Sequence, residues 1–520
     1  MRTMKICTLV LLFAAAFRVC STPAETLDRL LTASYGRHGL SPVERASDEI
    51  FLRRAMIDVT GRLPKISEIR RFTADKDPGK RAKLIENLLA SPRFADVAAM
   101  RLADMFRIKS EFPINLWPNA VQGYHRFFRD AVAQNRPWNG IARELLTASG
   151  SNFRNFAANF FRASAERTPE GLAKVTALSL MGLRTGRLSA DDREKFAAFF
   201  SRIRFKSTDE WKEEIVFTDP DAVRVSARTP DGQTFEIDSP ATDPRTVFAD
   251  WLTAKGNPFF ARAFVNRVWY WLLGSGLVEP ADDLPLPPGF WSKVSGVFSP
   301  ADDNEKILDF LAEEFERSGY DIRALFALIL NSRAYTADWK TRPEEQEKAE
   351  KYFAVYRMRR LEAEFLVDAF SQVLNAHEKY SSVIPEPFTF LPAGTPAVTI
   401  ADGSITSRTL DNFGKPSRDA GTLEERNNRI TPSQRLFLLN SNWIYQRALQ
   451  LPGRMFQKRR IKDSARIEEL YLAILSRKPA ADEIKQVFAY RKSLPRKFQW
   501  RIWADLAWAL LNTQEFLYHH

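Results

Sequence analysis

Apolar side chains recur at three- and four-residue spacing along most of the chain, and this pattern predicts a mainly α-helical protein. The pattern is broadest between Asp243 and Leu284. Asp243 is expected to cap a helix that has Pro244 at its first position and that ends at Gly256. Asn257 is expected to cap a second helix, beginning at the next residue, that is apolar on nearly every side. Other helices usually bury a helix of this kind, so we expect it at the centre of the fold.

Shorter helices are predicted on both sides of this stretch from their start and stop signals. Ser47 is an expected N-cap for a helix that Gly61 ends, and Ser91 is expected to cap another. A long helix is expected from Pro343 through the apolar positions that follow it. The C-terminal segment is also predicted to be helical, and His519-His520 is expected to be a free terminus.

One segment between the helical regions departs from the helical period. Val223, Val225 and Ala227 alternate with polar residues, and Thr234–Ile237 forms a second β-rich run after the turn signal Pro230-Asp231-Gly232. These features predict a small β-hairpin, with a structureless linker as the alternative. The expected fold class is therefore mainly α: two helical domains with a small β-hairpin insertion between them.

The chain of 520 residues is long enough for more than one domain, and its 45% hydrophobic residues supply ample core material. The predicted division is a signal peptide at 1–24, a first helical domain at 26–206, a β-hairpin linker at 207–242 and a second helical domain at 243–520. A short basic start, a largely apolar run and small residues are typical of a secretory signal peptide.

We therefore expect an extracytoplasmic protein: periplasmic, secreted or on the cell surface. Cleavage is expected after Ser21 or Ala24, and lipidation of Cys20 is the alternative. Both cysteines, Cys7 and Cys20, lie in the leader, so no disulfide is expected. No later run has the roughly 18 apolar residues of a transmembrane helix, so no transmembrane segment is expected after the signal peptide.

The formal net charge is +12, and about +9 once the leader is removed. The basic residues are dispersed and no recognition motif is present, so a nucleic-acid partner is not expected. An acidic polysaccharide or an anionic surface is the physically reasonable partner, and a generally basic solvated surface is the alternative. None of the five histidines has a second ligand at metal spacing, so neither a metal nor another cofactor is expected.

Several motifs in the first half resemble the DUF1549 domain of secreted planctomycete and verrucomicrobial proteins. They include Phe51-Leu52-Arg53-Arg54, the run from Asp58 to Pro64, and Leu88-Leu89-Ala90-Ser91-Pro92-Arg93. NPFFARAFVNRVWYWLLGSGLVEPADDL and EERNNRITPSQRLFLLNS resemble the companion DUF1553 domain. The resemblance implies a pair of helical domains whose biochemical activity is not established. It also implies sulfatase-like partners in polysaccharide-degrading bacteria.

Many members of this family carry a Cys-x-x-Cys-His motif, the attachment site of a c-type haem, just after the first domain. The corresponding stretch here runs from Leu178 to about residue 200 and contains neither Cys nor His. Covalent haem needs thiols for its thioether bonds and a His to ligate the iron. Electron transfer is therefore disfavoured for this member.

The segment Arg408–Arg435 has the highest concentration of polar residues and turn signals, which favours a functional loop. Its arginines are expected to grip a carboxylate or sulfate, and its asparagines to bond sugar hydroxyls. The alternative is that its arginines and acids neutralise one another and pin the loop to helices. The candidate ligand-binding residues are Arg408, Asp411, Arg418, Asp419, Glu425, Arg426, Asn427, Asn428 and Arg429, with Arg262 and Asn266 of the central helix.

Two further sets of polar residues are candidates for a site. Glu364 and Asp368 are four apart, as paired catalytic carboxylates on one helix face would be, but Arg360 is placed to form a structural ion pair with Glu364. Arg262 and Asn266, with Arg267, interrupt an apolar helix and must find partners. They are expected to bond loop carbonyls or, alternatively, to line a pocket with the Arg408–Arg435 segment.

The sequence contains no nucleophile–base set, P-loop or dinucleotide fingerprint, so no catalytic residue is assigned. The first functional hypothesis is a binding or scaffolding protein linked to the use of acidic or sulfated polysaccharide. The alternative is a glycan-acting enzyme with its site in the Arg408–Arg435 segment.

Overall fold

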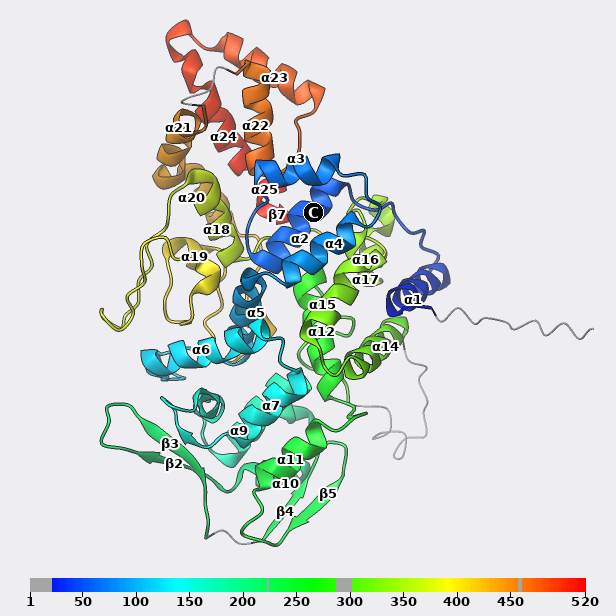
Figure 1. Cartoon of the computed structure of the whole chain (residues 1–520), viewed down its shortest axis with the longest axis vertical. Helices are drawn as coiled ribbons and strands as arrows, with labels where there is room; N and C mark the ends of the chain where they lie inside the picture. The colour runs from blue at the N-terminus through cyan, green and yellow to red at the C-terminus, as the bar shows by residue number, and fades with distance from the viewer. Residues whose placement is uncertain (1–20, 222–223, 287–301, 457–460) are drawn as a thin grey trace, which may run out of the picture.

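The computed structural model of the protein describes residues 21–221, 224–286, 302–456 and 461–520. The predicted signal peptide lies almost wholly outside these ranges. The described chain is mainly helical, as expected, and is elongated along one axis (Figure 1). Short β-strands lie at one end of the molecule, the last helices of the chain lie at the other, and α2, α5, α12 and α15 occupy the middle.

The helices before residue 200 include the two that were predicted to begin after Ser47 and Ser91. They are α1 (Pro23–Arg37), α2 (Asp48–Thr60), α3 (Ile66–Ala74), α4 (Lys80–Leu89), α5 (Pro92–Met105), α6 (Pro118–Ala133), α7 (Trp138–Thr147), α8 (Asn159–Arg162), α9 (Pro169–Thr176) and α10 (Ala190–Ala197). The Ser47 hydroxyl accepts the Ile50 N–H at the start of α2, and Gly61 ends that helix with φ +65°. Both signals are thus confirmed, because glycine adopts this left-handed conformation without steric cost.

The later helices lie in the region that the second domain was predicted to occupy. They are α11 (Pro244–Leu252), α12 (Phe260–Leu273), α14 (Asp303–Arg317), α15 (Ile322–Asn331), α16 (Arg333–Thr336), α17 (Gln346–Lys351), α18 (Ala363–Leu374), α19 (Arg408–Asn412), α20 (Pro432–Asn440), α21 (Asn442–Phe456), α22 (Asp463–Leu475), α23 (Ala481–Ser493), α24 (Ile502–Leu511) and α25 (Gln514–Leu517).

Helix α12 is the buried central helix that its apolar pattern predicted. Trp269 is fully buried, and the helix packs against α14, α15 and α16. Asp243 caps α11 by accepting the Arg245 N–H at 2.9 Å. The Asn257 side chain accepts two backbone N–H groups, but α12 begins at Phe260 and not directly after Asn257. The cap was therefore predicted correctly and the first helical residue was placed two positions too early.

Two of the three small antiparallel sheets of the described chain lie near the α9–α11 helices (Figure 1). The predicted hairpin is present as β4 (Val225–Arg228) and β5 (Thr234–Ile237), and β4 packs on α10. A three-stranded sheet that was not predicted has the order β1-β3-β2, formed by β1 (Gly150–Ser151), β2 (Ile203–Ser207) and β3 (Glu214–Thr218). The first part of the expected linker is thus tied to a segment more than 60 residues earlier.

Buried apolar residues form two clusters. Most members of the larger cluster lie between Leu27 of α1 and Tyr356, so this cluster includes residues on both sides of position 243. The smaller joins α18–α25 with apolar residues of α2 and α5, among them Ile57, Val97 and Met100. The predicted domain boundaries stay a prediction, because these clusters show where side chains pack and not where a domain ends.

The prediction of a long helix from Pro343 is wrong. Helix α17 ends at Lys351, Phe353 has a positive φ of 57°, and the chain then extends into β6 (Arg359–Arg360) before α18. β6 pairs with β7 (Tyr518–His519). The C-terminus was expected to be free, and this expectation is wrong. His519 is 3% exposed and lies 3.6 Å from a carboxylate oxygen of Asp58. This pairing joins segments distant in sequence, and local periodicity carries no signal for it.

Within the described ranges, no helix combines the length and the apolar character that crossing a membrane requires. The side chains of those ranges also include no cluster of three or more His, Cys, Asp or Glu residues placed to hold a metal ion.

Candidate functional site

Buried ion pairs hold the Arg408–Arg435 segment against the helices beneath it, α5 and α18. Arg418 is 1% exposed; its Nε donates to Asp104 Oδ1 at 2.8 Å and its Nη1 donates to the Ala401 carbonyl at 2.7 Å. Arg426 donates to Glu364 Oε2 at 2.6 Å and to Asp104 Oδ2 at 2.6 Å. These two predicted site residues therefore hold the segment against α5 and α18.

The charge state of this cluster follows from a competition between burial and pairing. Burial raises the pKa of Asp104, but Arg426 and Arg418 outweigh it and hold the pKa below its usual value. The same balance, with Arg426 as the partner, lowers the pKa of Glu364. Both carboxylates are thus ionised at neutral pH, and each buried charge has an opposite charge within hydrogen-bond distance.

Three acids of the segment also serve its own conformation. Asp419 pairs with Lys109 at 2.6 Å. Glu425 accepts the backbone N–H groups of Asp419, Ala420 and Gly421, and Asp411 accepts the Thr406 hydroxyl. For these three acids the alternative expectation holds: their side chains bind cations, hydroxyls or N–H groups of the protein and hold the loop in place.

Glu364 and Asp368 do not act as a carboxylate pair. Glu364 pairs with Arg426, and Asp368 accepts the N–H groups of Ala397 and Val398, where burial raises its pKa to about 7. The predicted ion pair between Arg360 and Glu364 is also wrong, because Arg360 lies on β6 and Glu364 lies on α18. The Arg360 guanidinium instead donates to backbone carbonyls of the loop region.

Of the three polar residues of α12, Asn266 bonds loop carbonyls, which was the first of the two expectations, and Arg267 lines a cavity with residues of the Arg408–Arg435 segment, which was the second. Asn266 donates to the carbonyls of Val278 and Ala281 and accepts the Val278 N–H. Arg267 donates to the Leu178 carbonyl at 2.5 Å. Arg262 pairs with Asp309 of α14, so the side chain of this predicted site residue is directed to another helix.

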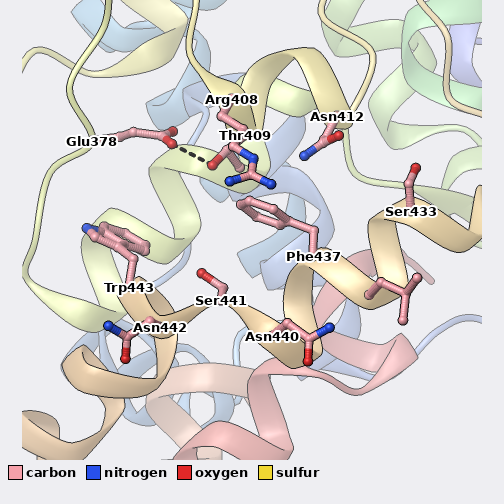
Figure 2. Close-up of a pocket in the computed structure, with 11 residues that line it drawn as sticks. Glu378, Arg408, Thr409, Asn412, Ser433, Phe437, Asn440, Ser441, Asn442 and Trp443 are labelled. Carbon is pink, nitrogen blue, oxygen red and sulfur yellow. Dashed lines mark hydrogen bonds between the residues drawn. The ribbon is translucent and has the colours of Figure 1, made fainter.

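A pocket of about 680 Å³ lies between α19, α20 and α21, and is called the Arg408 pocket here (Figure 2). Its walls combine a cation, two aromatic rings and side-chain amides. The lining residues that matter most for binding are Glu378, Arg408, Asn412, Phe437, Asn440 and Trp443. This composition suits a polar ligand with an acidic group and flat apolar faces.

Arg408 is a predicted site residue whose guanidinium is exposed at the rim of a pocket. Its guanidinium lies 5.8 Å from the centre of the Phe437 ring, and Figure 2 shows Trp443 across the pocket. Among the described residues, the Arg408 side chain contacts the Phe437 ring and has neither an ion-pair nor a hydrogen-bond partner. An exposed guanidinium with five free N–H donors fits a carboxylate or sulfate.

Glu378 is the acid of the Arg408 pocket. It accepts the Thr409 hydroxyl, as the dashed line in Figure 2 shows. Burial raises the pKa of Glu378, and its hydrogen bonds only partly oppose this. A carboxyl group in this state keeps its proton to higher pH than an exposed glutamate does.

A second pocket of about 550 Å³, called the Asn428 pocket here, holds the other polar residues of the segment. Arg426, Asn427, Asn428 and Arg429 line it, facing Tyr270 and the Glu279–Ala281 turn. Asn428 Oδ1 is buried and has no hydrogen-bond partner among the described residues. Asn266 supports the opposite wall through its bonds to that turn, so the two predicted sets meet here indirectly.

Several lining residues of the Arg408 pocket were missed by the sequence reasoning. Phe437, Asn440 and Trp443 follow the polar segment directly, and the aromatic and amide residues at the α20–α21 junction were the available signal. Glu378 lies 31 residues before Thr409, its hydrogen-bond partner, and nothing in the sequence connects them.

Two family descriptions match the chain. Residues 26–181 match PSCyt2, a protein of unknown function (DUF1549). Residues 244–490 match PSD1, a protein of unknown function (DUF1553). The chain carries the DUF1549–DUF1553 domain pair. The Arg408 pocket lies wholly within the DUF1553 match, whereas Asp104, which anchors the loop, lies within the DUF1549 match. No curated protein and no solved structure matches this DUF1549–DUF1553 protein.

Proposed function

We propose that this DUF1549–DUF1553 protein is an extracytoplasmic binding protein that holds an acidic or sulfated polysaccharide in the Arg408 pocket. The observation that carries the proposal is the Arg408 guanidinium, which faces a pocket of aromatic and amide side chains without a carboxylate partner among the described residues. Arginine presents a planar fork of donors that matches the geometry of carboxylate and sulfate groups.

The remaining walls of the pocket suit a sugar ring. Trp443 and Phe437 offer flat apolar surfaces, and Asn412 and Asn440 offer both donors and acceptors for hydroxyl groups. The net positive charge of the chain favours the approach of a polyanion from solution. The leader-like residues 1–24 support a location outside the cytoplasm, where such polymers are met.

Affinity electrophoresis of the purified chain in gels containing a sulfated, a carboxylated or a neutral polysaccharide tests the proposal. The wild-type protein is expected to be retarded by the acidic polymers, and less so at higher salt because surface charges are screened. Arg408→Ala is expected to weaken binding roughly tenfold or more, the usual effect of losing a hydrogen bond to a charged group.

Arg435→Ala is the matched control. Arg435 is exposed on α20 and lies outside the lining of the Arg408 pocket, so this variant loses the same charge beside the site. Equal weakening in both variants would mean that the polymer responds only to overall charge. Unchanged binding in Arg408→Ala would remove this pocket from consideration.

The second candidate function is a glycan-acting enzyme, which the raised pKa of Glu378 favours. A glycosidic general acid needs a pKa above that of an exposed carboxyl group, and burial shifts the pKa of Glu378 in that direction. Release of reducing ends from an acidic glycan, lost in Glu378→Gln while affinity is kept, would establish the enzyme. Binding without any product in the wild type would leave the binding protein.

A further inference from the structure

We infer that a single halide ion, chloride in ordinary media, binds in a small cavity beside the Arg267 guanidinium, beneath the Arg408–Arg435 segment. The inference is independent of the proposed function, because the cavity is separate from the Arg408 pocket. The cavity has a volume of about 20 Å³ and is lined by Arg101, Asp104, Arg267 and Arg426 among others.

Arg267 is the cation of this cavity that has no acid. It is 1% exposed, and the one hydrogen bond that its side chain makes within the described chain goes to the Leu178 carbonyl. Its Nε and Nη1 atoms are buried without a partner among the described residues. By contrast, Arg101 pairs with Glu362, and Arg426 pairs with Glu364 and Asp104. A buried guanidinium with unsatisfied donors is costly unless an anion or a polar atom meets it.

A second unpaired cation lies directly behind the cavity wall. Arg107 is 1% exposed and bonds Met105 O, Ala163 O and Ser179 Oγ, and its Nη2 has no partner within the described chain. Gly421 lines the cavity, and a Cβ at that position would lie 2.9 Å from Arg107 Nη1. Arg107 and Arg267 each raise the local electrostatic potential, so an anion near them is favoured.

The nearby carboxylates are committed to other donors. Asp282 attracts Arg267, but one of its oxygens pairs with Arg184 and the other accepts the Leu423 N–H. Glu425 faces Arg107 at longer range and is occupied by the backbone N–H groups of its own loop. Both arginines therefore keep an excess of positive charge that these acids do not neutralise.

The size of the cavity selects the ligand. A volume of about 20 Å³ holds one water-sized particle and excludes sulfate, phosphate or a carboxylate. A water molecule would fill the space and satisfy one donor, but it would leave the charge of Arg267 uncompensated. A monoatomic anion satisfies both requirements, because it accepts several N–H donors and carries the opposite charge.

The direct test is crystallography of the full mature chain grown in sodium bromide, with data collected at the bromine absorption edge. An anomalous peak in the cavity, within hydrogen-bond distance of Arg267, is expected. Density in the cavity without an anomalous signal would mean that water occupies it, and the inference would be overturned.

The solution test compares thermal unfolding in sodium chloride and in sodium gluconate at equal ionic strength. The wild type is expected to have a Tm higher by roughly 1–3 °C in chloride, because an ion that binds the native state alone stabilises it. Arg267→Met is expected to lose this difference. Arg262→Met removes a cation from the same helix but outside the cavity, and it is expected to keep the chloride effect.

Equal Tm values of the wild type in the two salts would contradict the inference, as would a chloride effect that persists in Arg267→Met. If Arg267→Met does not fold, the bromide crystals of the wild-type chain still decide the question.

Discussion

The guanidinium of Arg426 donates to Asp104 at 2.6 Å although 322 positions separate the two residues in the sequence. The same guanidinium is bonded to Glu364, so one side chain joins α5, α18 and the loop. Asp104 lies in the segment that matches DUF1549 and Arg426 in the one that matches DUF1553. This ion pair is therefore a direct link between the two members of the domain pair.

Replacing Arg426 with alanine is expected to destabilise the protein strongly. The change leaves the buried carboxylate of Glu364 without a cation and removes one of two cations from Asp104. Loss of one partner from a buried pair costs about 3–5 kcal/mol. Urea unfolding of Arg426→Ala measures this cost, and Arg429→Ala, an exposed arginine of the same loop, is expected to stay within ~0.5 kcal/mol of the wild type.

The same pair predicts how the stability difference depends on pH. The folded-state pKa of Asp104 and of Glu364 lies below the unfolded value, so their contribution is complete above about pH 4–4.5. It is lost as the pH falls through the lower folded-state values. The gap in unfolding free energy between wild type and Arg426→Ala should therefore narrow below pH 4, and a constant gap would contradict the ion-pair account.

His125, on α6, is a buried histidine. The side chain is 6% exposed, and burial, aided by Arg418 and Arg129, lowers its pKa to about 3. The unfolded chain binds a proton at this residue below about pH 6.5, whereas the folded chain stays neutral down to about pH 3. Stability is thus lost as the pH falls below 6.5, by up to ~1.4 kcal/mol per pH unit from this residue.

His125→Gln removes the titrating group and keeps a polar side chain. Unfolding free energies measured between pH 5 and 7.5 should therefore fall less steeply toward acid in His125→Gln than in the wild type. His377→Gln, a change in a less buried histidine, serves as the control. Parallel curves for the wild type and His125→Gln would show that His125 is not buried in its neutral form.

Deleting residues 518–520 is expected to destabilise the fold. The deletion removes β7, which pairs with β6, and the carbonyl that accepts Arg54 Nε. It also exposes the buried contact between Asp58 and Arg359 to solvent. We expect a loss of roughly 2–4 kcal/mol from the removed hydrogen bonds and packing. His520→Ala keeps the backbone contacts and should change the unfolding free energy much less; an equally small effect of the deletion would contradict the structural role of β7.

Asn266→Ala is expected to loosen the wall of the Asn428 pocket. Asn266 is fully buried and satisfies two carbonyls and one N–H of the turn that carries Glu279 and Pro280. Unpaired buried polar groups cost about 1–3 kcal/mol each, so a loss of roughly 2–4 kcal/mol is expected. Hydrogen exchange of residues 276–284 should quicken in this variant, whereas Asn442→Ala, at an exposed site, should leave it unchanged.

The sequence predicted much of the local structure because the signals for helix ends and faces are local. Ser47, Gly61 and Asp243 begin or end the helices in which they lie, and the apolar period of α12 indicates that this helix is buried. It also marked the Arg408–Arg435 segment as the polar centre of the second half, and Arg408 itself faces a pocket. It did not separate Arg408 from Arg418 and Arg426, because all three are arginines in the same kind of loop.

Tertiary structure decided that separation, since the carboxylates that neutralise Arg418 and Arg426 come from α5 and α18, far away in the sequence. It also decided that β6 and β7 pair and that His125 and His519 are buried. The sequence alone thus determined the helical character of the chain and several of its helix ends, such as Ser47, Gly61 and Asp243. Which charged side chains are free to bind was decided only in the folded molecule, because neutralisation depends on distances in space and not on spacing along the chain.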